Sequence, residues 1–325
     1  MTSKKMIWGF LLLFLFGEAL FSAEIRTGIE VEFRTFYLRN HDPNFSFQFR
    51  EAKLFFDTFI SDHSSALIEF SLKENQKNAQ LERGYFVWRF KKAHARLKFG
   101  QMRLPFGFWD NYSISRPLIK DHFVGHDPAY PDFKLRRLDV GVQMSARRGK
   151  FTGEISVLNG NSIQTATDNN NQKDYLLRAG YRTGSLAIHL QSYFGVQQKK
   201  KEFKFLPVPD TRHIYAYGGD FGVHLNRLSI SGEFTSVKYS PNQSIGGYLQ
   251  FNYNVLPYIL GMRLIGKFEY WDPDRRIDDD EVFQSILGFK QSVSRGLTVQ
   301  LEYIYNSKQI HSLANGALME VELEL

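Results

Sequence analysis

The amino-acid sequence predicts an all-β protein, a transmembrane antiparallel β-barrel of about sixteen strands. Three observations lead to this prediction. Apolar and polar residues alternate from Glu24 to Leu325, with the two-residue period of a β-strand. Short and long connections alternate between these segments, and aromatic residues gather near the segment ends. These last two features are typical of membrane barrels, in which short turns face one side and longer loops the other.

Residues 1–23 have the features of a secretory signal peptide. Two lysines precede Met6–Gly17, a run of twelve residues without a charge, and the small residues Ser22 and Ala23 follow. A basic start, an apolar centre and a small-residue end define such signals. The apolar run is too short to span a bilayer comfortably, so a cleaved signal is favoured over an uncleaved anchor. We therefore expect residues 24–325 to form the barrel.

Sixteen segments alternate. In the segment 297–306, Leu297, Val299 and Leu301 share one face, whereas Thr298 and Gln300 share the other. A tilted membrane strand needs about 9–11 residues, so the chain is long enough for all of them. A barrel of this size encloses an aqueous channel. The predicted strands are residues 26–39, 44–60, 65–74, 79–90, 93–104, 135–147, 150–158, 173–183, 185–196, 211–225, 227–240, 245–255, 257–272, 281–293, 296–307 and 315–325.

A soluble β-sandwich would alternate in the same way. The signal peptide, the unequal connections and the aromatic segment ends favour the barrel. Residues 105–134 form the longest loop, which either folds into the channel or stands outside it. The predicted short turns are Ser61–Ser64, Lys91–Lys92, Arg148–Gly149, Gly184, Asn226, Leu256 and Ser294–Arg295. Pro241–Ser244 is predicted as a loop. The aromatic residues near the segment ends are Tyr37, Phe45, Phe90, Tyr193, Tyr270, Trp271 and Tyr305.

The composition excludes several classes of protein. The absence of cysteine excludes disulfides and thiolate chemistry. A mean hydropathy of −0.34 and a single long apolar run exclude a helical membrane protein. No motif of a hydrolase, a phosphate-binding loop or a zinc protease is present. We therefore expect no enzyme activity, no cofactor and no nucleic-acid partner, and we interpret the pair His122 and His126 and the acidic run Asp278–Glu281 as loop residues without a metal. A net charge of +7 favours anionic partners.

The alternation also predicts a basic channel wall in the first half of the chain. Around residues 45–60 the apolar phase changes by one position, which predicts a β-bulge. Rows of basic side chains in a pore concentrate anions and repel cations. The alternative is that these charges keep the lumen wet and pair with acids, as in any polar lumen. The predicted pore-lining residues are Arg34, Arg50, Lys53, Arg83, Arg89, Arg96, Lys98 and Arg137, with Arg116 and Lys120 in the long loop.

Three stretches carry a resemblance to a known family. They are Phe49–Leu54 (FREAKL), Tyr85–Phe90 and Leu97–Phe108 (LKFGQMRLPFGF). Supported by Asp139–Gly141 and Val157–Gly160, they resemble the phosphate-selective porin O and P family over residues 45–160. The resemblance implies a trimeric barrel of sixteen strands that passes anions. Arg50 and Lys53 match the early basic positions of the family, but its second arginine is Glu51 here. Gly100, Gln101, Pro105, Phe106 and Gly107 match the motif where a strand enters the long loop.

Together these features predict a bacterial outer-membrane porin for passive diffusion of small solutes, with a preference for anions, phosphate among them. The expected partners are small anionic solutes and outer-membrane lipid, and the resemblance implies a homotrimer. Two other functions stay open: a barrel that sheathes or docks another protein, such as an electron-transfer partner, and a lipid-modifying or proteolytic barrel enzyme. The sequence contains no assembled catalytic triad that would support the latter.

Overall fold

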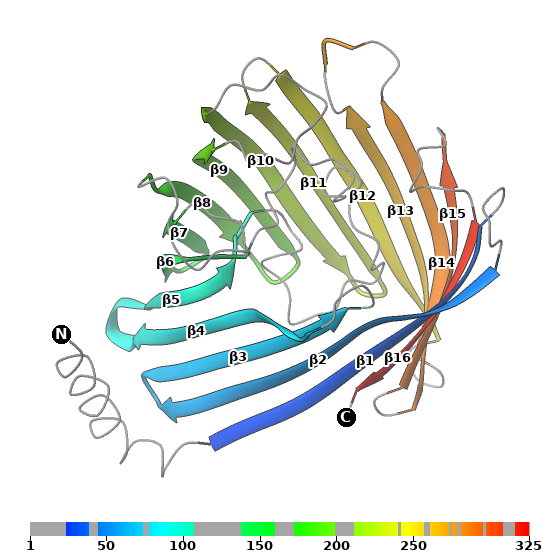
Figure 1. The fold of residues 1–325 in the computed structure, drawn as a ribbon, viewed down its shortest axis with the longest axis horizontal. Helices are drawn as coiled ribbons and strands as arrows, with labels where there is room; N and C mark the ends of the chain where they lie inside the picture. Colours follow the sequence, from blue (N-terminus) through cyan, green and yellow to red (C-terminus); the bar gives the residue numbers. More distant parts are fainter. Residues whose placement is uncertain are drawn as a thin grey trace.

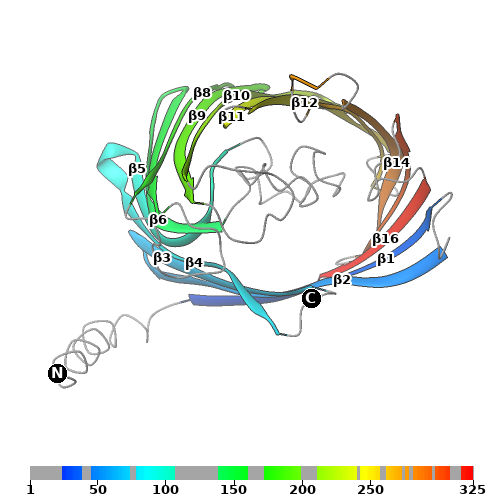
Figure 2. The same ribbon diagram turned by 45° about the horizontal axis from the view of Figure 1, so that its top comes forward.

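The computed structural model describes residues 24–38, 45–73, 78–106, 138–159, 172–198, 211–239, 242–256, 261–272, 275–277, 281–294, 297–307 and 316–324. These residues form one antiparallel sheet that closes into a barrel where β1 pairs with β16 (Figures 1 and 2). This confirms the predicted fold class. The strands are β1 (Glu24–Leu38), β2 (Phe45–Ser61), β3 (Ser64–Lys73), β4 (Gln80–Phe90), β5 (Ala95–Arg103), β6 (Leu138–Arg148), β7 (Phe151–Leu158), β8 (Asp174–Arg182), β9 (Leu186–Gln198), β10 (Thr211–Leu225), β11 (Leu228–Tyr239), β12 (Asn242–Leu256), β13 (Met262–Asp272), β14 (Val282–Ser294), β15 (Leu297–Asn306) and β16 (Gly316–Glu324).

The predicted strand limits agree with these within five residues, but two predictions around β12 were wrong. The predicted loop Pro241–Ser244 is largely strand, because Asn242 pairs with Tyr239 in a tight hairpin. Ser244 lies opposite Val237 of the inner cluster, so its polar side chain belongs to the lumenal phase of β12 and does not mark a loop. The predicted turn at Leu256 is instead the longer connection 257–261, which ends at Gly261 with a φ of +55°. Glycine adopts this left-handed conformation without steric cost.

The two ends of the barrel differ. At one end, here called the short-turn end, the connections span two to five residues, and both the start of β1 and the end of β16 lie there. The short 3₁₀ helix η1 (Lys91–Ala93) joins β4 to β5, and His94 and Asn226 take left-handed φ angles in their turns. The other end, the long-loop end, carries mostly longer connections, including the one after β5, while the β11–β12 hairpin at this end is tight. The predicted asymmetry is therefore present.

The two faces of the sheet have opposite chemistry. Large apolar side chains such as Phe151, Leu177 and Leu190 are exposed on the outer face, and polar side chains such as Glu69, Gln143 and Gln191 are buried on the inner face. This is the pattern of a barrel whose outer wall contacts lipid and whose lumen is polar. No helix in the described part of the chain is long and apolar enough to cross a membrane.

The predicted β-bulge between residues 45 and 60 is confirmed. Along β1 and β2, Glu32 lies opposite Glu51 and the next residue, Phe33, lies opposite Phe49, so Arg50 is the extra residue. A bulge shifts the alternation by one position, which explains why the apolar phase changes along β2. Further register shifts lie between β2 and β3, β3 and β4, β12 and β13, and β14 and β15.

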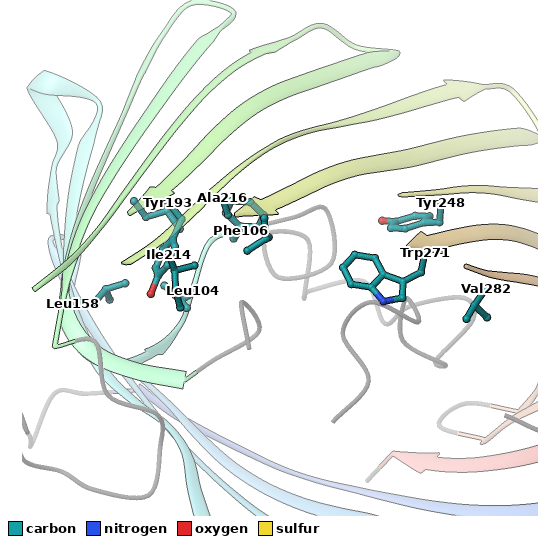
Figure 3. Packing of buried hydrophobic residues seen from close by; sticks show 11 residues of the cluster. Leu104, Phe106, Leu158, Tyr193, Ile214, Ala216, Tyr248, Trp271 and Val282 are labelled. Atoms are coloured by element: carbon teal, nitrogen blue, oxygen red, sulfur yellow. The ribbon is translucent and has the colours of Figure 1, made fainter. Parts of the chain in front are cut away.

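Apolar side chains also gather inside the lumen, toward the long-loop end. Leu104 and Phe106, which follow β5, are each 1% exposed and lie beside Ile214 and Ala216 of the inner wall (Figure 3). The first residues of the longest connection therefore point into the barrel, while residues 107–134 lie outside the described part of the chain. Two of the predicted aromatic segment ends, Tyr193 and Trp271, belong to this inner cluster, because each shares the phase of polar lumenal neighbours on its strand.

Candidate functional site

Three cationic side chains lie side by side on the lumenal face of β4 and β5. Arg89 is directly opposite Arg96 in the strand register, and Lys98 lies one step further along β5, opposite Val87. Directly opposite residues of an antiparallel pair have Cβ atoms about 5 Å apart. We call Arg89, Arg96 and Lys98 the basic row.

The partners of the basic row are mostly uncharged. The Arg89 guanidinium donates to Ser65 Oγ at 2.8 Å, and Arg96 Nε donates to Ser145 Oγ at 2.7 Å. Within the described residues the row has one carboxylate at ion-pair distance, with Arg96 Nη2 and Glu154 Oε1 separated by 3.8 Å. The row therefore carries an excess of positive charge that faces the channel.

Lys98 has an aromatic partner. Its ammonium lies 4.7 Å from the centre of the Tyr85 ring, which faces the lumen on β4. The negative face of an aromatic ring attracts a cation without neutralising its charge. The ring therefore holds the ammonium in place and leaves it able to act on a passing ion.

Two other predicted pore residues are neutralised by acids. Lys53 Nζ lies 3.1 Å from Glu51 and 3.7 Å from Glu30, and Arg83 forms an ion pair with Glu69 on β3. Strand register places Glu30 opposite Lys53 and Glu69 opposite Arg83, and Glu51 lies two residues from Lys53 on the same face of β2. Among the predicted pore residues whose side chains the structure describes, the excess positive charge thus lies in the basic row.

For the remaining predicted pore residues, the structure describes the backbone alone or no atoms. The backbone of Arg34 pairs with Gln48 of β2 and Glu320 of β16, and Arg50 is the bulge residue of β2. Their side chains lie outside the described part of the structure, as do Arg116, Lys120 and Arg137 as a whole.

A buried charged cluster in the wall was not predicted. Asp220 of β10 accepts a hydrogen bond from Arg178 of β8 at 2.7 Å and lies 2.7 Å from His189 Nδ1 on β9. The side chains of all three are at most 8% exposed. Each lies in the lumenal phase of its strand, so strand alternation could have placed them on one face, but only register brings them together.

A second buried ion pair joins Lys267 and Glu269 on β13, where both side chains are fully buried. Among the described residues, no group of three or more His, Cys, Asp or Glu side chains could hold a metal ion. The pair His122 and His126 lies outside those residues.

The residues at the end of β5 make close contacts with the backbone of β4. Gly100 has a φ of +129°, and a Cβ there would lie 2.3 Å from the Gly84 carbonyl oxygen. The Gln101 amide donates to the Leu81 carbonyl at 2.7 Å. Pro105 and Phe106 are buried at the entry to the long connection. Glycine is therefore required at position 100 because β4 lies too close for any side chain.

A family model described as phosphate-selective porin O and P matches residues 21–198, more than half of the chain. The chain belongs to this family. The match covers the basic row and the Gly100–Gln101 segment, so the resemblance predicted from these residues is confirmed. No curated protein sequence matches this porin.

Solved outer-membrane barrels have the same fold as this porin. A trimer form of OmpT of Vibrio cholerae superposes with a TM-score of 0.71 at 12% identity, covering 93% of this chain and 99% of that chain. OmpF of Salmonella typhi in complex with daunomycin gives a TM-score of 0.68 at 11% identity, covering 93% and 97%. The channel DcaP of Acinetobacter baumannii gives a TM-score of 0.66 at 13% identity, again covering 93% and 97%. At these identities the likeness extends to the fold alone.

The family and the fold together make this protein a porin-like channel of the bacterial outer membrane, and such channels are not enzymes. The short-turn end of the barrel therefore faces the periplasm, and the long-loop end faces the outside of the cell.

Proposed function

We propose that this porin admits small anionic solutes by passive diffusion and that the basic row attracts them. The observation that carries the proposal is the excess positive charge of Arg89, Arg96 and Lys98, which have one carboxylate at ion-pair distance among the described residues. Cationic side chains on a low-dielectric wall raise the local concentration of anions. Diffusion through such a wall needs no catalysis.

The chemistry of the row suits oxyanions. A guanidinium presents several donors in a flat fork that matches phosphate or carboxylate oxygens, and an ammonium adds a point charge. Arg89 and Arg96 lie at one register position with Lys98 beside them, so a single oxyanion could contact more than one of them. The name of the family specifies phosphate, and we extend that specificity to this chain as a proposal.

The apolar entry to the long connection supports a narrowed channel. Leu104 and Phe106 occupy the lumen and cover Ile214 and Ala216, which would otherwise face water (Figure 3). A narrower path strengthens the influence of wall charges, because less water screens a passing ion. Arg116 and Lys120, further along this connection, remain proposed pore residues.

Reversal potentials in planar bilayers test the anion preference. Under a potassium chloride gradient, the purified porin should show stepwise currents with an anion-biased reversal potential. The Arg96→Glu, Lys98→Glu variant should move the potential toward that of potassium. The control is Lys238→Glu, which makes one such reversal of charge on an exposed residue of β11 in the outer phase. Equal potentials for the parent and the double variant would refute the role of the row.

Adding inorganic phosphate to the chloride solution tests the finer proposal. Phosphate bound at the row should reduce the chloride current in the parent and much less in Lys98→Gln. An unchanged chloride current at millimolar phosphate would limit the proposal to a general preference for anions.

We also propose that residues 1–23 are removed as a signal peptide and that the mature porin is a homotrimer. The family resemblance supports the trimer, and one of the similar structures, OmpT of Vibrio cholerae, is described as a trimer form. The mass of the intact protein from outer membranes should correspond to a chain beginning at Glu24, and native mass spectrometry in detergent should give three copies. A chain retaining its first residues, or a monomer, would contradict these two proposals separately.

A further inference from the structure

The outer wall of the barrel carries a groove across β6, β7, β8 and β9. It has a volume of about 560 Å³. Its outward-facing lining consists of apolar and small side chains: Met144, Ala146, Gly153, Ile155, Leu177, Ala179, Leu190 and Ser192. Three more lining residues on these strands have side chains in the lumenal phase. The groove is thus an indentation in the surface that contacts lipid.

The groove exists because small residues share one register row. Ala146 lies opposite Gly153, Gly153 opposite Ala179, and Ala179 opposite Leu190. A Cβ added at Gly153 would meet no atom within 4 Å, so the space beside this residue is open. Met144, Ile155 and Leu177 form the next row toward the long-loop end and give the groove its apolar wall.

The row on the periplasmic side of the small residues is aromatic and basic. Phe151 and Tyr181 lie opposite each other with ring centres 5.3 Å apart, and Arg148 lies opposite Phe151 on its other side. Adjacent rows on one face of a strand are about 6.7 Å apart. Arg148 therefore stands directly at the periplasmic end of the groove. Lys150 follows in the turn, and its carbonyl accepts a 2.8 Å hydrogen bond from the backbone N–H of Arg182.

Positive charge is concentrated in the short turns at this end of the barrel. In the described short turns and the residues flanking them, the exposed cations are Lys91, Lys92, Arg147, Arg148, Lys150, Arg182 and Arg227. The acid in these turns is Asp62, between β2 and β3, which lies 2.8 Å from Lys91. That ammonium lowers the pKa of Asp62, so this carboxylate is already charged and paired. Residues 145–153 and 179–188, which flank the groove, contain no acid.

We propose that this groove binds one anionic phospholipid of the periplasmic leaflet, with an acyl chain on Ala146, Gly153 and Ala179 and its phosphate against Arg148 and Lys150. The groove supplies an apolar surface for the chain, and the cations lie at the depth of the lipid headgroups. Basic side chains next to a membrane surface attract anionic headgroups in this way. The site lies on the outer wall and is independent of the diffusion pathway.

Native mass spectrometry of the delipidated porin with added phosphatidylglycerol tests the proposal. We expect one phosphatidylglycerol bound per chain, with phosphatidylcholine bound much more weakly. Replacing both Arg148 and Lys150 with alanine should weaken phosphatidylglycerol binding about twenty-five-fold, because each cation near the surface contributes about fivefold. Gly153→Leu should abolish binding by filling the groove, and Ala179→Phe provides a second filling variant if the first does not fold.

Two controls separate the site from a general surface effect. Arg227→Ala removes an exposed cation from a periplasmic turn that does not border the groove. Ala52→Leu enlarges a side chain in the outer phase of β2. Both should bind phosphatidylglycerol like the parent. Equal binding of the two phospholipids, or an equal loss in Arg227→Ala, would overturn the proposal. It would also fail if the filling variants changed the number of chains per particle, because the groove would then be an interface between copies.

Discussion

Arg89 and Arg96 lie directly opposite each other on neighbouring strands, so two guanidinium groups share one step of the β4–β5 ladder. Like charges in this position destabilise a sheet. Each arginine is held by a serine hydroxyl, Ser65 or Ser145, and these hydroxyls leave the positive charge in place. The arrangement is unfavourable for the wall by itself, which is consistent with a role toward a solute.

Arg89→Gln should therefore separate stability from selectivity. Removing one of the two like charges should raise the free energy of unfolding by about 0.5 kcal/mol, whereas the anion preference should decrease. Glutamine retains a donor for Ser65. Urea unfolding in detergent micelles and the reversal potential of the same preparation measure the two effects. A variant with a lower urea midpoint and an unchanged potential would show that Arg89 serves the wall alone.

The paired cations should matter less for selectivity than the basic row. In Lys53→Gln, Glu51→Gln, a cation and its 3.1 Å partner are removed together, so the wall keeps its net charge. We expect the reversal potential of this double variant to match that of the parent. Lys98→Gln, which removes a cation with no carboxylate at ion-pair distance among the described residues, should shift the potential toward potassium. A larger shift in the double variant would place the selective charges on β2.

The buried cluster should be sensitive to the loss of one member. Asp220→Asn leaves Arg178 as a buried charge without its carboxylate, which should cost about 3 kcal/mol of stability. The double variant Arg178→Met, Asp220→Leu removes both charges and should recover most of that loss. Thermal unfolding in detergent measures both variants. If the double variant were as unstable as the single one, packing of the side chains would matter more than their charge.

Gly100 should not tolerate a side chain. Its positive φ and the 2.3 Å approach of a Cβ to the Gly84 carbonyl predict a loss of about 1–3 kcal/mol in Gly100→Ala. Gly184→Ala is the matched control, because an added Cβ there meets no atom within 4 Å. The fraction of refolded barrel on unheated gels, as a function of urea, compares the two variants. Equal urea midpoints would mean that β4 and β5 can move apart without a loss of stability.

The alternation of apolar and polar residues along the sequence was sufficient to predict the barrel. Successive side chains of a strand point to opposite faces, so lipid on one side and water on the other impose a period of two that can be read directly from the chain. The bulge at Arg50 could be predicted for the same reason, since one extra residue inverts that period. The lumenal placement of Arg83, Arg89, Arg96 and Lys98 followed from the alternation as well.

Only the tertiary structure decided which lumenal cations are paired with carboxylates and which are not. Lys53 is paired with Glu30 and Arg178 with Asp220 because strand register places residues far apart in the sequence at one height of the wall. Register depends on bulges, on turn lengths and on the closure of β1 against β16, and none of these is a local property of a strand. The sequence therefore determined the faces of the sheet, and closure of the barrel determined the neighbours on each face.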